Sequence, residues 1–258
     1  MLFRSVAGLD ELVSDKLRPN YERFIRKLYQ TRAHELGWAG KPGEDENTKE
    51  LRSSLLALVA GRGEDQQLVK QAIDLANKWL DDHKAVQPEL VGTVLGVAAR
   101  HGDQKLFDRI YAAAKQTTDR VERGRLLSAM GAFNDPKIQA QSFTIMLSSE
   151  FELREGLALM QGGFQDPRTR QATFELVEQH FDELMNRIPP AYRPFMAQLA
   201  AIPCDSSKKS DVSAFFTPKF EKIDGGPRAL AQALEELDLC WAQKQAQLPG
   251  VEAFLKVQ

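Results

Sequence analysis

The chain has 258 residues, of which 43% are hydrophobic and 27% are charged, and its formal net charge is −2. This composition is ordinary for a globular protein. A net charge near zero provides no positive field for nucleic acid. No apolar run approaches the roughly 20 residues that span a bilayer. We therefore expect neither a nucleic-acid partner nor a membrane partner.

The N-terminus and the two cysteines bear on the cellular location of the protein. Residues Met1 to Ser5 do not provide the apolar stretch of a secretion signal. Cys204 and Cys240 are too few for a disulfide framework and fit a reducing compartment as free thiols. We expect a cytoplasmic protein. Helical patterning starts almost at Met1 with no capping signal before Leu9, so we also expect that the chain begins inside a structure that continues upstream.

The first segment, residues 9–36, has apolar residues at helical spacing. Pro19 should kink or split it, because the proline ring removes a hydrogen bond and crowds the preceding turn. The polar residues 40–47 that follow, rich in Gly, Pro and charge, predict a loop.

A turn then recurs between helical segments. Its aspartates, spaced 38, 32 and 31 residues apart, are Asp65, Asp103, Asp135 and Asp166. Each should cap the helix that follows it, which is worth about 1 kcal/mol. Such a period is typical of repeated helix pairs that stack because no pair can bury its apolar face alone.

After residue 188 the regular spacing ends, and shorter helices should precede a long helix that stops near Pro249 and a short tail helix. Alternating strand patterns are essentially absent. The predicted fold is all-α, an α-solenoid of antiparallel helix pairs similar to HEAT or armadillo repeats. We expect one domain, with entry helices and a loop over 1–46, regular pairs over 47–188 and irregular helices over 189–258.

The chemistry-bearing residues form no recognisable site. His34-Glu35 could begin the zinc-peptidase motif H-E-x-x-H, but Trp38 stands where the second histidine is required. The other histidines are distant in sequence from one another and from the cysteines, and Cys204 has no neighbouring histidine. We therefore expect no catalytic residue, no metal ligand and no cofactor-binding residue in this chain.

Arginines cluster in the central pairs. They could line one face of a solenoid and meet carboxylates of a peptide or a partner domain, although charge runs are more often solvated helix surfaces. The candidate contact residues are Arg123, Arg125 and Arg154.

Several segments in order resemble the C-terminal helical domain of zinc aminopeptidases of the puromycin-sensitive and endoplasmic-reticulum type. They are Leu36-Gly37-Trp38, Leu51-Arg52-Ser53-Ser54-Leu55-Leu56, Ala76 to Leu80, Val91 to Gly102, Tyr111, Leu126 to Ala129, Asp135, and Leu237 to Trp241 running on to Phe254-Leu255. These are mainly packing residues, so their order carries the resemblance. In that family the zinc site lies upstream, on H-E-x-x-H with a G-A-M-E-N peptide-anchoring loop, and neither motif occurs here. The family often has Arg-Gln-Asp where this chain has Leu153-Arg154-Glu155.

The resemblance implies a non-catalytic domain whose partners are peptides and an upstream zinc-containing catalytic domain of the same polypeptide. Such a domain would enclose the active-site chamber and control which peptides enter and what length is preferred. A free-standing helical-repeat scaffold that binds a protein partner is the alternative.

Overall fold

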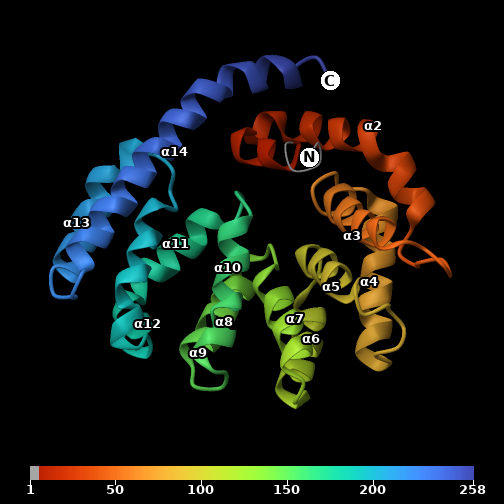
Figure 1. Cartoon of the computed structure of the whole chain (residues 1–258), viewed down its shortest axis with the longest axis horizontal. Coiled ribbons are helices and arrows are strands. Elements are labelled where there is room, and N and C mark those ends of the chain that lie inside the picture. Colours follow the sequence, from red (N-terminus) through yellow and green to blue (C-terminus); the bar gives the residue numbers. More distant parts are fainter. Residues whose placement is uncertain (1–5) are drawn as a thin grey trace. The chain divides into compact units, whose positions relative to one another are not determined.

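The computed structural model describes residues 6–258, and all secondary structure in this range is helical (Figure 1). The prediction of an all-α fold is confirmed. Residues 1–5, where we found no secretion signal, lie outside the described range. The elements in chain order are η1 (Leu9–Leu12), η2 (Asp15–Leu17), α2 (Arg18–Leu36), α3 (Glu46–Gly61), α4 (Gln66–Asp81), α5 (Val91–Arg100), α6 (Gln104–Gln116), α7 (Arg120–Gly131), α8 (Pro136–Leu147), α9 (Leu153–Gly156), α10 (Ala158–Gln165), α11 (Arg170–Gln179), α12 (Phe181–Arg187), η3 (Pro190–Ala201), η4 (Ser206–Lys208), α13 (Lys209–Phe220) and α14 (Gly226–Leu255).

The chain divides into two compact units. Unit 1 comprises Met1–Ile138 with Gly250–Gln258, and unit 2 comprises Gln139–Pro249. The breaks between the units, after residues 138 and 249, coincide with neither of the internal boundaries expected near residues 46 and 188. The organisation as a single domain stays a prediction.

Unit 1 is built from helices that pack on their neighbours in sequence. Contacts join α2 to α3, α4 to α5 and α6 to α7, and α5 also contacts α3 and α7. Helix α5 is apolar around most of its circumference, which suits a helix packed against three others; its buried residues are Val91, Val94, Leu95, Val97, Ala98 and Ala99. This neighbour-to-neighbour packing is the pattern expected of stacked pairs.

The recurring aspartates act as caps at three of the four turns. The carboxylates of Asp65 and Asp103 each accept a hydrogen bond from the backbone N–H three residues later. The carboxylate of Asp135 accepts from the backbone N–H groups two and three residues later. Asp166 accepts from the backbone N–H of Arg168, within the turn before α11, rather than from α11 itself. The prediction of a helix cap is therefore correct for three of the aspartates. The fourth, Asp166, caps the turn that precedes α11 instead of the helix itself.

Two proline positions differ in effect. Pro19 lies in the first turn of α2, where its missing N–H costs nothing, so the expected split falls just before it, between η2 and α2. The predicted stop near Pro249 is wrong, because α14 continues through that residue to Leu255. Within unit 1, this last turn of α14 lies beside α2 (Figure 1). The side-chain amide of Asn20 donates to the Leu255 carbonyl at 2.7 Å.

Unit 2 has an aromatic core contributed by α11, α12 and α13. The ring of Phe181 lies 5.4 Å from that of Phe216 and 6.0 Å from that of Phe220, measured between centroids. Phe216 and Phe220 are fully buried, whereas Phe215 keeps part of its surface exposed.

The cysteines correct a second prediction. Cys204 and Cys240 form a disulfide, with their Cα atoms 5.4 Å apart. The turn after η3 lies against α14 within unit 2, where Ser206 donates to Asp238 at 3.0 Å and Lys209 pairs with the same carboxylate. Residues 36 positions apart are thus brought within bridging distance. Counting cysteines could not reveal this tertiary contact, which replaces the two free thiols expected from the sequence by a disulfide.

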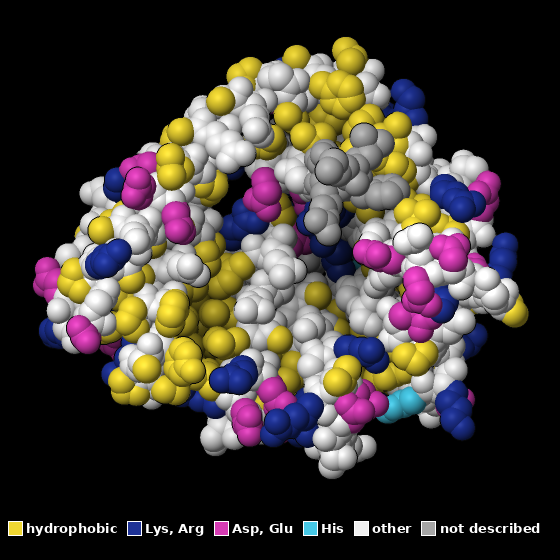
Figure 2. Space-filling view, viewed as in Figure 1, with side chains coloured by type: hydrophobic (Ala, Val, Ile, Leu, Met, Phe, Trp, Pro, Cys, Tyr) yellow, Lys and Arg dark blue, Asp and Glu magenta, His cyan; other side chains and the backbone are white. Residues whose placement is uncertain are grey.

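None of the described helices combines the length and apolarity needed to cross a bilayer. Basic and acidic side chains are interspersed over the face shown in Figure 2.

Candidate functional site

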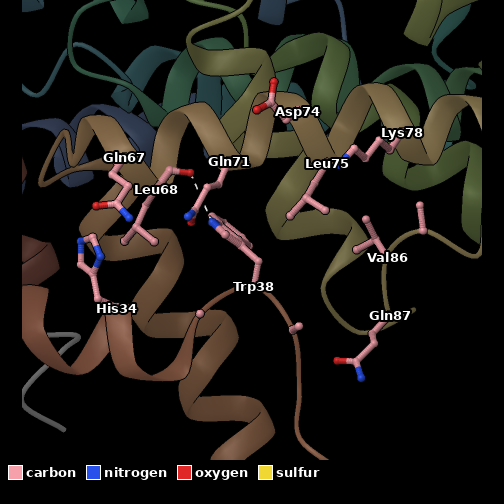
Figure 3. A pocket seen from close by; sticks show the side chains of 13 residues that line it. His34, Trp38, Gln67, Leu68, Gln71, Asp74, Leu75, Lys78, Val86 and Gln87 are labelled. Carbon is pink, nitrogen blue, oxygen red and sulfur yellow. Dashed lines mark hydrogen bonds between the residues drawn. The ribbon is translucent and has the colours of Figure 1, made fainter.

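A cavity of about 530 Å³ lies in unit 1 between the loop after α2, helix α4 and the segment before α5. Figure 3 shows Trp38 pointing from the loop toward α4, with His34 and Gln67 at one end and Val86 and Gln87 at the other. This volume lies within the range of small-ligand sites. The cavity is therefore the first candidate for a binding site in unit 1.

The loop geometry places Trp38 in the cavity. Gly37 ends α2 with a φ of 60°, a left-handed conformation that glycine adopts without steric cost. The chain then turns, and the Trp38 indole N–H donates to the Leu68 carbonyl on α4 at 3.2 Å (Figure 3). Only 8% of Trp38 stays exposed, so its ring forms a wall and not a mobile cover.

Two further contacts fix this loop. The Gly40 N–H donates to the side-chain carbonyl of Gln87 at 2.9 Å. Arg52 on α3, which is 1% exposed, donates through Nε to the Leu36 carbonyl and forms paired bonds with the Glu44 carboxylate. These bonds from Arg52 hold the pKa of Glu44 below its usual value. The loop is thus attached at both ends and in its middle.

His34 and Asp65 meet at the end of the cavity. Nε2 of His34 lies 2.9 Å from Oδ2 of Asp65, and the Gln30 amide donates to the same oxygen at 2.6 Å. Burial alone would raise the pKa of Asp65, but the hydrogen bonds from His34, from the Leu68 N–H and from Gln30 outweigh burial and lower it. An ionised carboxylate only accepts hydrogen bonds, so in this contact Nε2 of His34 is the donor.

A second cavity of about 480 Å³ adjoins the first, sharing His34 and Gln67. Its walls come from α2 and from the turn that precedes α4, and the further lining residues are Glu22, Arg26, Gln30, Glu64, Asp65 and Gln66. Both cavities lie in unit 1, on either side of the His34 ring.

The side chains here suit binding rather than bond cleavage. No Ser, Thr or Cys lines either cavity, so His34 has no nucleophile to activate. Over residues 6–258, no group of three or more His, Cys, Asp or Glu could hold a metal ion. Side-chain amides, the His34 imidazole, carboxylates and the indole wall can hydrogen-bond and enclose a ligand.

The arginines predicted as contacts lie elsewhere. Arg123 and Arg125 are partly exposed on α7 in unit 1, and Arg123 donates to the Thr117 carbonyl at 2.8 Å. Arg154 is exposed on α9 in unit 2. Two neighbouring arginines of the same cluster are engaged locally: Arg168 pairs with Asp166 at 3.1 Å, and Arg170 donates to the Phe164 carbonyl at 2.9 Å. The contact role of the three candidates stays a prediction.

Sequence reasoning missed the His34 cavity because it compared histidines only with one another and with cysteines. A sequence signal for the pair exists, because His34 lies 31 residues, about one repeat, before the cap Asp65 that it contacts in the structure. A histidine one repeat before a capping aspartate can meet it when helix pairs stack.

Comparisons with known proteins agree with this architecture. A model of the ERAP1-like C-terminal domain matches residues 1–239. The chain is 25% identical to Aminopeptidase 2 of Candida albicans over 219 residues, which is 83% of this chain and 23% of that protein. It is 23% identical to Aminopeptidase 2, mitochondrial, of Saccharomyces cerevisiae over 220 residues, covering 84% and 23%. Puromycin-sensitive aminopeptidase of Caenorhabditis elegans is 26% identical over 133 residues, covering 52% and 14%.

The chain thus spans about a quarter of the length of the first two aminopeptidases. The family model covers nearly the whole sequence, including both units in large part. The resemblance seen in the order of the packing residues is confirmed: the chain belongs to the family of ERAP1-like C-terminal domains.

Proposed function

We propose that this chain is the non-catalytic C-terminal part of a zinc aminopeptidase and acts together with an upstream catalytic domain of the same polypeptide. The family match over residues 1–239 carries this proposal. Relatives named aminopeptidases extend well beyond the quarter of their length that the chain covers. In this proposal the zinc ion and the reacting groups belong to the upstream domain, and no residue of this chain is catalytic.

The domain would enclose the active-site chamber and control which peptides enter and which lengths are preferred. Stacked, HEAT-like helix pairs suit this task, because they present extended surfaces supported by a continuous core. The guanidinium groups of Arg123 and Arg125, which are partly exposed, and of Arg154, which is exposed, would meet peptide carboxylates, to which arginine can form two parallel hydrogen bonds. Peptides and the catalytic domain are its partners; nucleic acid and membranes are not.

The experiment compares native protein with the isolated chain. An antibody raised against residues 6–258 is used to recover the native protein, which is sized and sequenced by mass spectrometry. We expect a polypeptide about four times longer, by the share of the relatives covered, that contains H-E-x-x-H upstream. A native polypeptide of about this length that copurifies with a non-peptidase partner would instead identify the free-standing scaffold.

The contact role of the three arginines is tested in that native protein with acidic peptides and with a short aminoacyl substrate. Arg123→Gln, Arg125→Gln and Arg154→Gln are expected to raise KM for acidic peptides by several-fold each while kcat for a short aminoacyl substrate stays unchanged, since that substrate reaches only the catalytic domain. An equal effect on both substrate classes would argue against a contact role. Arg228→Gln, at an exposed arginine on α14, is the matched control.

A further inference from the structure

The disulfide between Cys204 and Cys240 lies at the surface of unit 2. Cys240 is exposed on α14, and Cys204, in the turn after η3, is partly exposed. Exchange with a small thiol requires that the attacking thiolate reach one of the two sulfurs. A buried disulfide would be protected from this reaction. The bond is therefore open to exchange from the side of Cys240.

The backbone of Cys204 adopts a costly conformation. Its φ is 44°, in the left-handed region that residues with a Cβ rarely occupy. Such a conformation persists where the surrounding structure imposes it. The Cys204 N–H donates to the Ala201 carbonyl at 3.1 Å, and the link to Cys240 holds the side chain. Opening of the disulfide removes one of these constraints and lets the turn relax, which favours reduction.

The disulfide also marks the point at which α14 ceases to be buried within unit 2. Leu230, Ala233 and Leu237 are buried at helical spacing along the first half of this helix. From residue 238 to residue 249, no residue of the helix is buried. The polar contacts of Asp238 with the turn before α13 are partly exposed and therefore weak. The disulfide is thus the covalent attachment of a helical segment that contributes no buried residue.

We propose that Cys204 and Cys240 form a reversible redox site that a small thiol such as glutathione opens by attack on Cys240. In the first step the glutathione thiolate bonds to Sγ of Cys240, the bond between the two cysteines breaks, and Cys204 leaves as a thiolate that takes up a proton. A second glutathione thiolate then displaces Cys240 and forms glutathione disulfide. The protein disulfide is thus reduced by two electrons, and two glutathione molecules are oxidised.

Reduction releases residues 239–249 of α14 and leaves residues 226–237 in place. The released segment has no buried residue, whereas buried leucine and alanine side chains hold the other. The contacts of Asp238 with Ser206 and Lys209 do not involve sulfur, and they keep the two thiols close enough for re-oxidation by glutathione disulfide. The site therefore switches the mobility of one segment reversibly. It depends neither on an upstream domain nor on the proposed aminopeptidase function.

The test uses the native protein and follows its cysteine-containing peptides by mass spectrometry. The folded protein is equilibrated with glutathione and glutathione disulfide at the ratio of the cytosol, free thiols are alkylated, and hydrogen exchange is measured on the same samples. We expect the disulfide to be mostly reduced at this ratio, which structural disulfides resist. Exchange of residues 239–249 should become about tenfold faster or more on reduction, and that of residues 226–237 should not change. A disulfide that stays oxidised, or exchange that is the same in both forms, would overturn the proposal.

Variants identify the attacked sulfur and separate the bond from the thiols. In Cys204→Ser, the remaining Cys240 should form a mixed disulfide with glutathione disulfide about tenfold faster than Cys204 does in Cys240→Ser, because Cys240 is more exposed. An equal or faster reaction of Cys204 would overturn Cys240 as the attacked sulfur. The double variant, with both cysteines replaced by serine, should exchange like the reduced protein at any glutathione ratio. Exchange like that of the oxidised protein would show that the disulfide does not hold residues 239–249, and would overturn the proposal.

Discussion

The imidazole of His34 on α2 lies 2.9 Å from the carboxylate of Asp65, which at the same time caps α4 by accepting the Leu68 N–H at 2.9 Å. One nearly buried side chain thus stabilises the start of one helix and connects it to another. Gln30 adds a second bond from α2. The turn between α3 and α4 is consequently fixed against α2, and the wall shared by the two unit 1 cavities depends on it.

Removing the Asp65 carboxylate should cost more than removing an ordinary cap. Asp65→Ala loses a cap worth about 1 kcal/mol and also the hydrogen bonds from His34 and Gln30 on α2, which together add about 1 kcal/mol or more. Asp103→Ala is the matched control, because Asp103 caps α6 from an exposed position. Urea unfolding should show a loss about twice as large for Asp65→Ala. Equal losses would mean that the contacts with α2 contribute nothing.

The same residue predicts a pH dependence. The folded-state pKa of Asp65 is lowered, so its ionised form is stabilised by folding. Its contribution is present above the unfolded pKa of about 3.9 and is lost as the pH falls through the folded value. The difference in unfolding free energy between the native chain and Asp65→Asn should shrink as the pH is lowered from 5 to 3. A difference that is constant or grows over this interval would contradict the lowered pKa.

Two glycines should respond in opposite directions to alanine. A Cβ at Gly102 would lie 2.9 Å from the Ala98 carbonyl oxygen and 2.9 Å from a ring carbon of Phe133, so the backbone or the ring must shift. Gly102→Ala should destabilise unit 1 by about 1–3 kcal/mol, the usual cost of overpacking. At Gly96, inside α5, an added Cβ meets nothing within 4 Å. Gly96→Ala should therefore stabilise by about 0.5–1 kcal/mol, and thermal unfolding of both variants measures the contrast.

The disulfide predicts a redox-dependent stability. Cys204 and Cys240 close a loop with a sequence separation of 36 residues, and loop-closure entropy for that length gives about 3–4 kcal/mol. Titration of the unreduced, unfolded protein should find no free thiol, and two after reduction. Cys240→Ser should lower the stability by a similar amount in the absence of reductant and leave it unchanged in its presence. Two free thiols in protein prepared without reductant would contradict the pairing and support the cytoplasmic location expected from the sequence, since cytosolic disulfides are rare.

Much of the fold follows from local rules that operate over a few residues. The helical spacing and the caps at Asp65, Asp103 and Asp135 depend on neighbours within one turn, and a single sequence contains that information. The continuation of α14 through Pro249 does not follow from local rules, because tertiary packing of its last turn against α2 outweighs the local cost of proline.

The candidate sites depend on contacts between residues that are far apart in the sequence. The pairing of His34 with Asp65 spans 31 residues, and the disulfide joins Cys204 to Cys240 across 36 residues. Sequence reasoning located no member of either pair as a site residue, because each is an ordinary residue until the packing of helices places it beside its partner. Arg123, Arg125 and Arg154 were chosen because arginines are frequent in that part of the sequence. This frequency does not show which groups each side chain contacts in the folded chain.

Aminopeptidase activity tests most directly whether catalysis belongs to an upstream domain. The isolated 258-residue chain and the immunopurified native protein are assayed side by side with aminoacyl substrates and added zinc. We predict zinc-dependent release of N-terminal residues by the native protein and none by the isolated chain. Zinc-dependent turnover by the isolated chain, or a native protein with no aminopeptidase activity, would contradict the account.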